Sequence, residues 1–81
     1  MSHTQLLLYF MNPQEKFGKK IKYYRTQKGF SQEELAFKAG LDRTYIASVE
    51  NGRRNVSIQT IKKFLNALEI SFSDFFKDFE K

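Results

Sequence analysis

The feature that most constrains the fold is a pair of short helical segments, each ended by a glycine, in "SQEELAFKAGLDRTYIASVENG" (residues 31–52). Ser31 followed by Glu34 has the spacing of an N-terminal capping box, and Asp42 occupies the equivalent starting position of the second segment. Gly40 lies in the link "AGLD" and supplies the left-handed residue that ends the first helix after about two turns. Because a short turn with a glycine makes the second helix cross the first at a steep angle, these residues predict two crossed helices.

Helix signals continue on both sides of this pair. Upstream, Asn12, Pro13 and Glu15 follow the order of an N-cap, a first helical position and a capping-box acid, and Gly29 ends the helix that they begin. Downstream, Ser57 caps "SIQTIKKFLNALEI". The apolar residues expected to face inward by helical spacing are Phe17, Ile21, Tyr24, Ile46, Val49, Ile61, Phe64, Leu65 and Leu68, and Leu35 and Leu41 are expected to anchor the helix pair from beneath. The upstream helix, which begins at Pro13, is expected to expose four basic residues on its outer faces, namely Lys19, Lys20, Lys22 and Arg25.

The C-terminal segment "SFSDFFKDFEK" predicts a fifth helix, capped by Ser71 or Ser73. Its four phenylalanines cannot all be buried in so small a domain, and an exposed apolar patch is expected to meet a partner. The predicted fold class is therefore all-α, with five helices in one domain. Residues 12–81 form this domain and end in a dimerisation helix, while residues 1–11 form an N-terminal arm, a docking segment or a leader before a second possible start at Met11.

The charge distribution favours a polyanionic partner. Residues 1–68 contain twelve Lys or Arg against five acidic residues, a balance of +7, whereas residues 69–81 contain two against four, a balance of −2. The basic surplus therefore belongs to the body of the domain. Such a surplus suits nucleic acid, although many small soluble proteins are also mildly basic.

Two further sequence features bear on location. Cysteine is absent, so disulfides do not stabilise the fold, and a reducing cytoplasm is the expected location. The apolar run "LLLYFM" at residues 6–11 is far shorter than a membrane span of about 20 residues, and it lacks the features of a signal peptide. We therefore expect no membrane partner.

Catalytic chemistry has little support in the sequence. His3 is the one histidine, and without cysteine the chain has no Cys/His set that could hold zinc. The tripeptide "GKK" at residues 18–20 lacks the upstream glycine spacing of a phosphate-binding loop. We expect no enzymatic activity, no cofactor and no small-molecule ligand.

Residues 17–76 resemble the lambda-repressor-like helix-turn-helix domain of the Xre/Cro type. The resemblance is carried by Gln32, Ala36, Gly40, Ile46, Val49, Glu50 and Gly52, followed by "RRNVSIQTIKKFLNAL". Within that family, "LDRTYIASVENGRRNVSI" is most similar to the controller proteins of restriction–modification systems, through "DRTYI" and the pair Arg54–Asn55. The resemblance implies a transcriptional regulator that binds a palindromic operator on double-stranded DNA as a homodimer and times endonuclease expression.

The second helix of the pair is the expected recognition helix, whose N-terminal residues meet base edges in the major groove. Arg43 can donate two hydrogen bonds to guanine, and Thr44 can bond a base or touch a thymine methyl group. Tyr45 either places its hydroxyl on a phosphate or packs within the protein. Gln32 begins the preceding helix, where backbone N–H groups favour a phosphate. The expected DNA contacts are Gln32, Arg43, Thr44, Tyr45, Ala47, Ser48, Asn51, Arg53, Arg54 and Asn55.

Each of these contacts has a structural alternative. Arg43 can pair with Asp42 or Glu50 on the surface, and Thr44 and Ser48 can be ordinary solvated residues. Glu50 is a poor DNA contact and a better structural partner for an arginine or a backbone amide. The helix-turn-helix context favours the DNA contact for Arg43.

A two-fold dimer would place two recognition helices about 34 Å apart, one turn of DNA, on a palindromic site. The expected dimer interface comprises Phe64, Leu68, Ile70, Phe72, Phe75 and Phe76. Two rival functions use the same fold. One is an antitoxin or protein-interaction domain, whose Phe-rich C-terminus grips another protein, and the other is a phage-type repressor.

Overall fold

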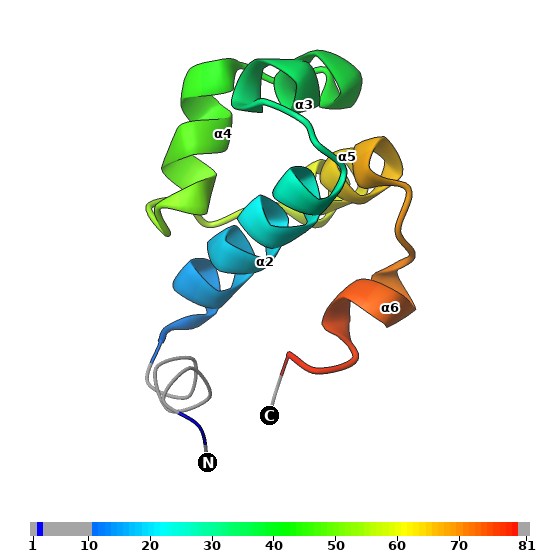
Figure 1. Cartoon of the computed structure of the whole chain (residues 1–81). Coiled ribbons are helices and arrows are strands. Elements are labelled where there is room, and N and C mark those ends of the chain that lie inside the picture. Colours follow the sequence, from blue (N-terminus) through cyan, green and yellow to red (C-terminus); the bar gives the residue numbers. More distant parts are fainter. Residues whose placement is uncertain (1, 3–10, 80–81) are drawn as a thin grey trace.

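The described part of the chain is all-helical, as predicted. The computed structural model describes residue 2 and residues 11–79 of the 81-residue chain, and within them it contains no strand. Its helices are α2 (Pro13–Gln27), α3 (Gln32–Ala39), α4 (Arg43–Glu50), α5 (Ile58–Leu68) and α6 (Phe72–Phe76). The long α2 runs through the molecule, α3 and α4 form a corner on one side of it, and α6 lies on the other side (Figure 1). Helices α3 and α4 pack on each other, and α4 also packs on α2 while α3 packs on α5.

Local capping explains where most helices begin. The Asn12 side chain accepts a hydrogen bond from the Glu15 N–H at 2.8 Å, and the Glu15 carboxylate accepts one from the Asn12 N–H at 3.2 Å. Ser31 and Glu34 form the same reciprocal box at the start of α3. Ser57 caps α5 and Ser71 caps α6, which settles the alternative between Ser71 and Ser73. The expected cap of α4 differs, because Asp42 occupies the N-cap position but its side chain makes no capping hydrogen bond.

Left-handed residues explain where four helices end, three of them at a glycine. Gly40, at φ 68°, ends α3 and turns the chain into α4. Gly29 and Gly52 follow α2 and α4 with φ 73° and 74°. The end of α5 was not predicted, because the left-handed residue there is Glu69, at φ 55°, and not a glycine.

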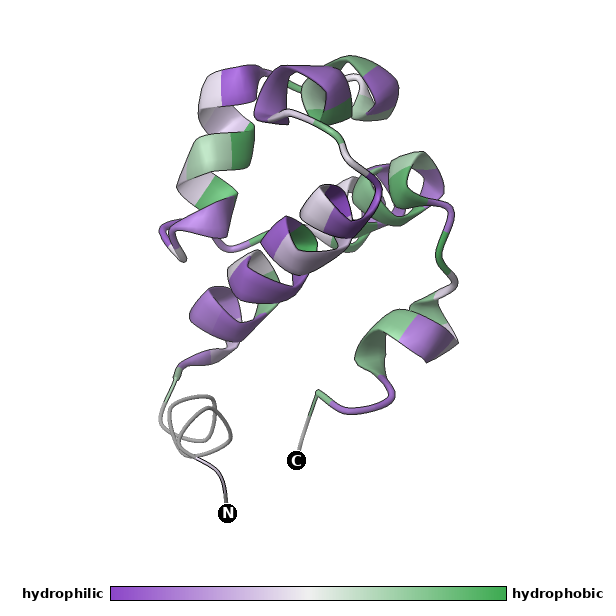
Figure 2. Ribbon diagram, viewed as in Figure 1, coloured by the Kyte–Doolittle hydropathy of each residue, from purple (hydrophilic) through white to green (hydrophobic). Residues whose placement is uncertain are grey.

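The core lies where the five helices meet. Its fully or almost fully buried side chains are Phe17, Ile21, Leu35, Ala36, Ile46, Val49, Phe64, Leu65, Leu68 and Phe75. Hydrophobic residues face one another between the helices, and hydrophilic residues cover the outer faces (Figure 2). The predicted inward faces are therefore confirmed, with Tyr24, Leu41 and Ile61 at the margin of the core.

The C-terminal helix is shorter and more deeply packed than expected. It spans five residues, and Phe75 is buried against Phe17, with ring centroids 5.5 Å apart. The Lys20 ammonium donates a hydrogen bond to the Phe75 carbonyl, and burial lowers the pKa of Lys20. Phe72 remains 42% exposed, while Phe76 and Phe79 are partly buried. The four phenylalanines of the C-terminal segment are thus divided between the core and the surface.

The structure bears on membrane spanning but not on most of the N-terminal arm. The N-terminal arm, residues 1–11, lies outside the described residues except for Ser2 and Met11. No helix in the described part is long and apolar enough to span a bilayer.

Candidate nucleic-acid interface

Helix α4 is fixed on one face and open on the other. Ile46 and Val49 are 0% and 1% exposed and anchor α4 in the core. Arg43 and Thr44, on its first turn, are exposed, and neither side chain has a hydrogen bond or ion pair to another residue of segment 11–79. The surface alternative, in which Arg43 pairs with Asp42 or Glu50, is therefore not what the protein adopts. The free polar face of α4 is a candidate contact surface.

A buried ion pair holds the C-terminal end of α4. Arg25 Nε lies 2.6 Å from Glu50 Oε2, and Arg25 Nη2 lies 3.1 Å from Glu50 Oε1. The two side chains are only 10% and 4% exposed. Gln32 Nε2 donates a further hydrogen bond to Glu50 Oε1, and Arg25 Nη1 donates one to the Phe30 carbonyl. Glu50 thus joins α4 to both α2 and α3, as expected for a structural partner of an arginine.

Arg25 was predicted to lie on an outer face of the helix that is now α2, and that prediction was wrong. The side chain is buried because its charge is neutralised by Glu50, which is distant in sequence and close in the fold. Helical periodicity alone places charged residues outside, so no signal within α2 identified this one. The sequence predicted an arginine as one possible partner of Glu50, but it did not identify Arg25 as that arginine.

Gly18 allows α2 to approach the end of α4 closely. A Cβ atom at this position would lie 2.1 Å from the Val49 carbonyl oxygen and 2.9 Å from that of Glu50. Both distances are shorter than any real Cβ contact, so only glycine fits without a backbone shift. Residue 18 was considered in the sequence only as part of "GKK", and its packing role was missed.

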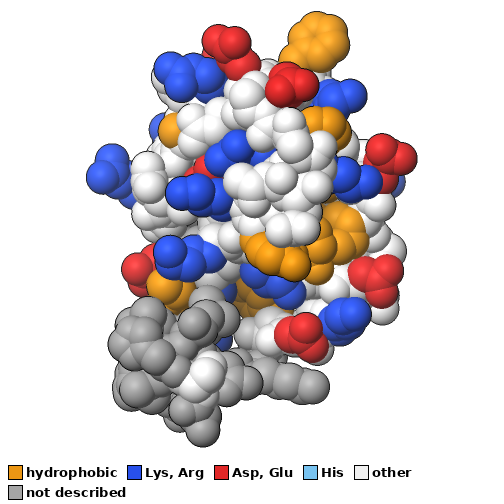
Figure 3. Space-filling view, viewed as in Figure 1, with side chains coloured by type: hydrophobic (Ala, Val, Ile, Leu, Met, Phe, Trp, Pro, Cys, Tyr) orange, Lys and Arg blue, Asp and Glu red, His pale blue; other side chains and the backbone are white. Residues whose placement is uncertain are grey.

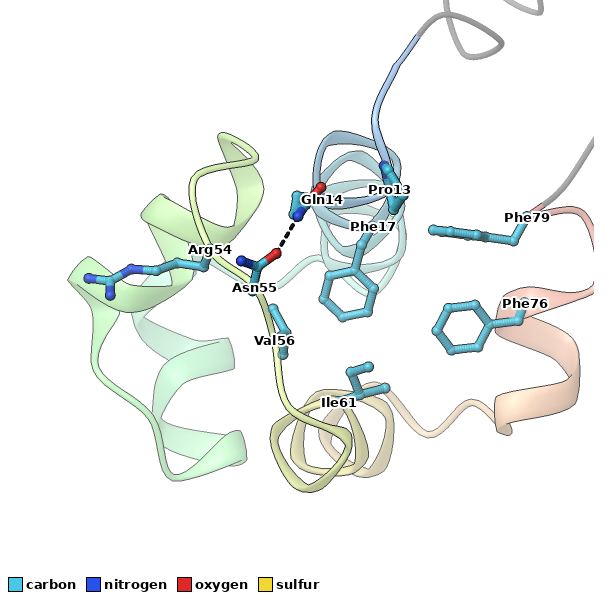
Figure 4. A pocket seen from close by; sticks show the side chains of 9 residues that line it. All are labelled: Pro13, Gln14, Phe17, Arg54, Asn55, Val56, Ile61, Phe76 and Phe79. Atoms are coloured by element: carbon cyan, nitrogen blue, oxygen red, sulfur yellow. Dashed lines mark hydrogen bonds between the residues drawn. The ribbon is translucent and has the colours of Figure 1, made fainter.

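One backbone and one side-chain hydrogen bond hold the segment after α4. The Arg53 N–H donates to the Ser48 carbonyl at 3.0 Å. Two residues later, Asn55 Oδ1 accepts a hydrogen bond from Gln14 Nε2 at the start of α2 (Figure 4). Between these anchors, the Arg54 side chain extends away from Asn55 and back over α4. The link therefore has a defined path.

The expected DNA contacts gather at α4 and its flanks. Arg43, Thr44, Asn51, Arg53, Arg54 and Asn55 are exposed, whereas Gln32, Tyr45, Ala47 and Ser48 are partly buried. The Gln32 amide donates to Glu50 in the free protein, so a phosphate would have to share it or use its remaining N–H. Contact of these ten residues with DNA stays a prediction.

The expected dimer residues do not lie on one surface. Phe64, Leu68 and Phe75 are 0–1% exposed within a single chain, so their side chains offer no area to a partner and belong to the core. Ile70, Phe72 and Phe76 retain surface, and the interface prediction rests on them. Two exposed apolar side chains were not considered in the sequence, namely Ile58 at 75% and Phe37 at 89%.

A shallow groove of about 250 Å³ separates the start of α2 from α6. It is lined by Pro13, Gln14, Phe17, Arg54, Asn55, Val56, Ile61, Phe76 and Phe79 (Figure 4). The described residues contain no group of three or more His, Cys, Asp or Glu side chains that could hold a metal ion.

Comparison with known proteins identifies the family. The helix-turn-helix family model matches residues 21–75, and the control protein C.MunI of a Mycoplasma species is 46% identical over 67 residues, 82% of this chain and 90% of the relative. The restriction–modification controller protein C.AhdI from Aeromonas hydrophila superposes with a TM-score of 0.75 at 49% identity, covering 78% of this chain and 96% of that one. The C.Esp1396I tetramer in complex with its natural 35 base-pair operator superposes with a TM-score of 0.78 at 39% identity, covering 83% and 88%. These matches confirm the resemblance seen in the sequence. The chain belongs to the helix-turn-helix family of transcriptional regulators, in the branch of the restriction–modification controller proteins.

Proposed function

We propose that the protein is a sequence-specific DNA-binding transcriptional regulator that binds a palindromic operator as a homodimer and controls a restriction–modification system. The observation that carries the proposal is the asymmetry of α4. Its inner face is fixed by Ile46, Val49 and the Glu50–Arg25 pair, while Arg43 and Thr44 are exposed on its outer face. A rigid helix with free hydrogen-bonding groups is what reading base edges requires.

The dimensions of α4 suit the major groove. An α-helix with its side chains is about 10–12 Å across, which matches the major-groove width of about 12 Å. Arg43 and Thr44 at its N-terminus are placed for base contacts, since recognition helices use their first turn. Arg53 and Arg54, beyond the other end, are placed for phosphates on the same duplex. The solved complex of C.Esp1396I with its operator supports DNA binding by a protein of this fold.

The dimer is proposed to form through the apolar surface around α6. Phe72 is exposed, and Ile70 and Phe76 are partly exposed beside it. Apolar side chains are visible on the surface toward α6 in the space-filling view (Figure 3). An assembly with two-fold symmetry would present two copies of α4 to a palindrome, at a separation of about 34–36 Å. The structural relative C.Esp1396I is a tetramer on its operator, which supports self-association in this branch.

The proposal includes no catalytic role and no cofactor. The contact surface consists of arginine, amide and hydroxyl groups suited to binding, and the family is one of regulators. A regulator of this kind acts where the DNA is, so the cytoplasm is its proposed location.

A salt titration tests the proposal. A duplex selected from a random-sequence library by the protein should bind with log K falling linearly with log salt, by about 0.9 per phosphate contact. Arg53→Ala should make that slope shallower by about 0.9, the contribution of one phosphate contact. Lys63→Ala, a matched loss of one exposed charge on α5, should leave the slope unchanged.

The same titration separates the rival function. An antitoxin or protein-interaction domain that does not bind DNA would select no common sequence from the library. A selected duplex that binds no better than random duplexes at moderate salt would overturn the regulator proposal.

A further inference from the structure

We propose that Tyr45 is a positioning residue for DNA binding, which acts through Arg54 by holding its guanidinium in place, and not a phosphate contact of its own. This inference rests on the proposed function. Two contacts hold Arg54, and a third supports the ring beneath it. Its guanidinium carbon lies 5.5 Å from the centroid of the Tyr45 ring, and its Nε donates to Ser48 Oγ at 3.2 Å. The Tyr45 ring in turn stacks on Phe64, with centroids 6.5 Å apart and planes at 23°.

The support beneath the arginine is rigid. Phe64 is fully buried in the core and cannot move freely, and the Tyr45 ring stacks on it. Tyr45 and Ser48 are three residues apart on α4 and therefore share one face of the helix. A guanidinium over an aromatic face is attracted by the ring quadrupole. Tyr45 is thus a platform that connects an exposed arginine to the core.

These contacts leave the two terminal nitrogens of the Arg54 guanidinium free. Only Nε is engaged within segment 11–79, so both terminal nitrogens can still donate to DNA. The residues on either side are held in place, because the Arg53 N–H donates to the Ser48 carbonyl and the Asn55 side chain accepts a hydrogen bond from Gln14. The side chain extends away from the groove, on the other side of the link from the Gln14–Asn55 bond (Figure 4).

Preorganisation explains why such an arrangement would matter. A flexible arginine loses rotamer freedom when it binds, and restraint in the free protein reduces that loss. Arg54 held on Tyr45 and Ser48 presents a planar fork that matches phosphate or guanine in one orientation. The alternative is a phosphate contact through the Tyr45 hydroxyl. That contact would require the hydroxyl group and would not require the face of the ring.

Substitutions at position 45 separate the two roles. Tyr45→Phe keeps the ring and removes the hydroxyl, whereas Tyr45→Leu removes the aromatic face and keeps apolar volume. The positioning role predicts that Tyr45→Phe binds the library-selected duplex like the natural protein, while Tyr45→Leu binds about two- to fivefold more weakly. In an Arg54→Ala background, Tyr45→Leu should have little further effect. A loss in Tyr45→Phe equal to that in Tyr45→Leu, or full additivity with Arg54→Ala, would overturn the inference.

A measurement without DNA distinguishes a failure of this inference from a failure of the proposed function. In NMR spectra of the free protein, the ring current of Tyr45 should shift the Arg54 side-chain resonances, and Tyr45→Leu should abolish that shift while Tyr45→Phe preserves it. Ser48→Ala, an exchange that spares the aromatic stack, should increase the ps–ns mobility of Arg54 Nε. Unchanged Arg54 shifts in Tyr45→Leu would refute the platform directly. Normal shifts in a protein that binds no DNA would instead refute the proposed function.

Discussion

The buried ion pair between Arg25 and Glu50 yields the sharpest stability prediction. Arg25→Met retains most of the side-chain stem but removes both hydrogen bonds to Glu50. Removing one partner of a buried pair leaves an uncompensated charge and costs about 3–5 kcal/mol in free energy of unfolding. Gln32 still donates to the carboxylate, so we expect the lower end, about 3 kcal/mol. An 81-residue domain has a total stability of about 4–12 kcal/mol, so the loss is a large fraction of it.

Urea denaturation followed by far-UV circular dichroism measures this loss, at one fixed protein concentration because self-association stabilises the folded state. Arg53→Met is the matched control, since that arginine is exposed and the change should stay within about 0.5 kcal/mol. Replacing both partners, by Arg25→Met with Glu50→Leu, should recover most of the stability, because no buried charge is then left unpaired. A loss below about 1 kcal/mol in Arg25→Met would show that the pair behaves like a solvated surface pair and would refute this reasoning.

Three further predictions concern packing, helix termination and assembly. Gly18→Ala should destabilise the fold by about 1–3 kcal/mol despite the higher helix propensity of alanine, since the new methyl group meets the Val49 carbonyl; unchanged thermal unfolding would contradict the close approach. Glu69→Gly should stabilise by about 1 kcal/mol, as it relieves a left-handed residue that carries a side chain; a lower urea midpoint would show that the Glu69 side chain matters more than its backbone. Phe72→Ser should shift the dimer towards monomer in sedimentation experiments across a concentration series, whereas Phe37→Ser, which removes an 89% exposed ring on α3, should not; equal effects would place the interface elsewhere.

The sequence predicted the helices well because their boundaries are set locally. Asn12 with Glu15 and Ser31 with Glu34 form their capping boxes within four residues, so no knowledge of the fold was needed to place them. The left-handed turn at Gly40 follows equally from one residue. These local signals, together with the spacing of apolar residues, were sufficient for the helix-turn-helix, while the family was inferred from the resemblance of its motif residues.

Features that depend on distant contacts were not predictable in the same way. The burial of Arg25 requires Glu50, and the need for glycine at position 18 arises only when α4 packs on α2. The division of the phenylalanines between core and surface has the same cause. Phe75 fills a space bounded by Phe17, which its own segment does not reveal, while Phe72 one turn earlier stays exposed.

The most direct test of the central claim is base-by-base binding of Arg43→Ala. The natural protein and the variant would be titrated against the library-selected duplex and against every single base-pair change within it. The account predicts that Arg43→Ala loses about 1–3 kcal/mol on the selected duplex and no longer discriminates at one base pair in each half-site, while preferences elsewhere persist. Equal weakening on every duplex, with all preferences intact, would show that Arg43 contacts phosphate and would contradict the claim that the free face of α4 reads the sequence.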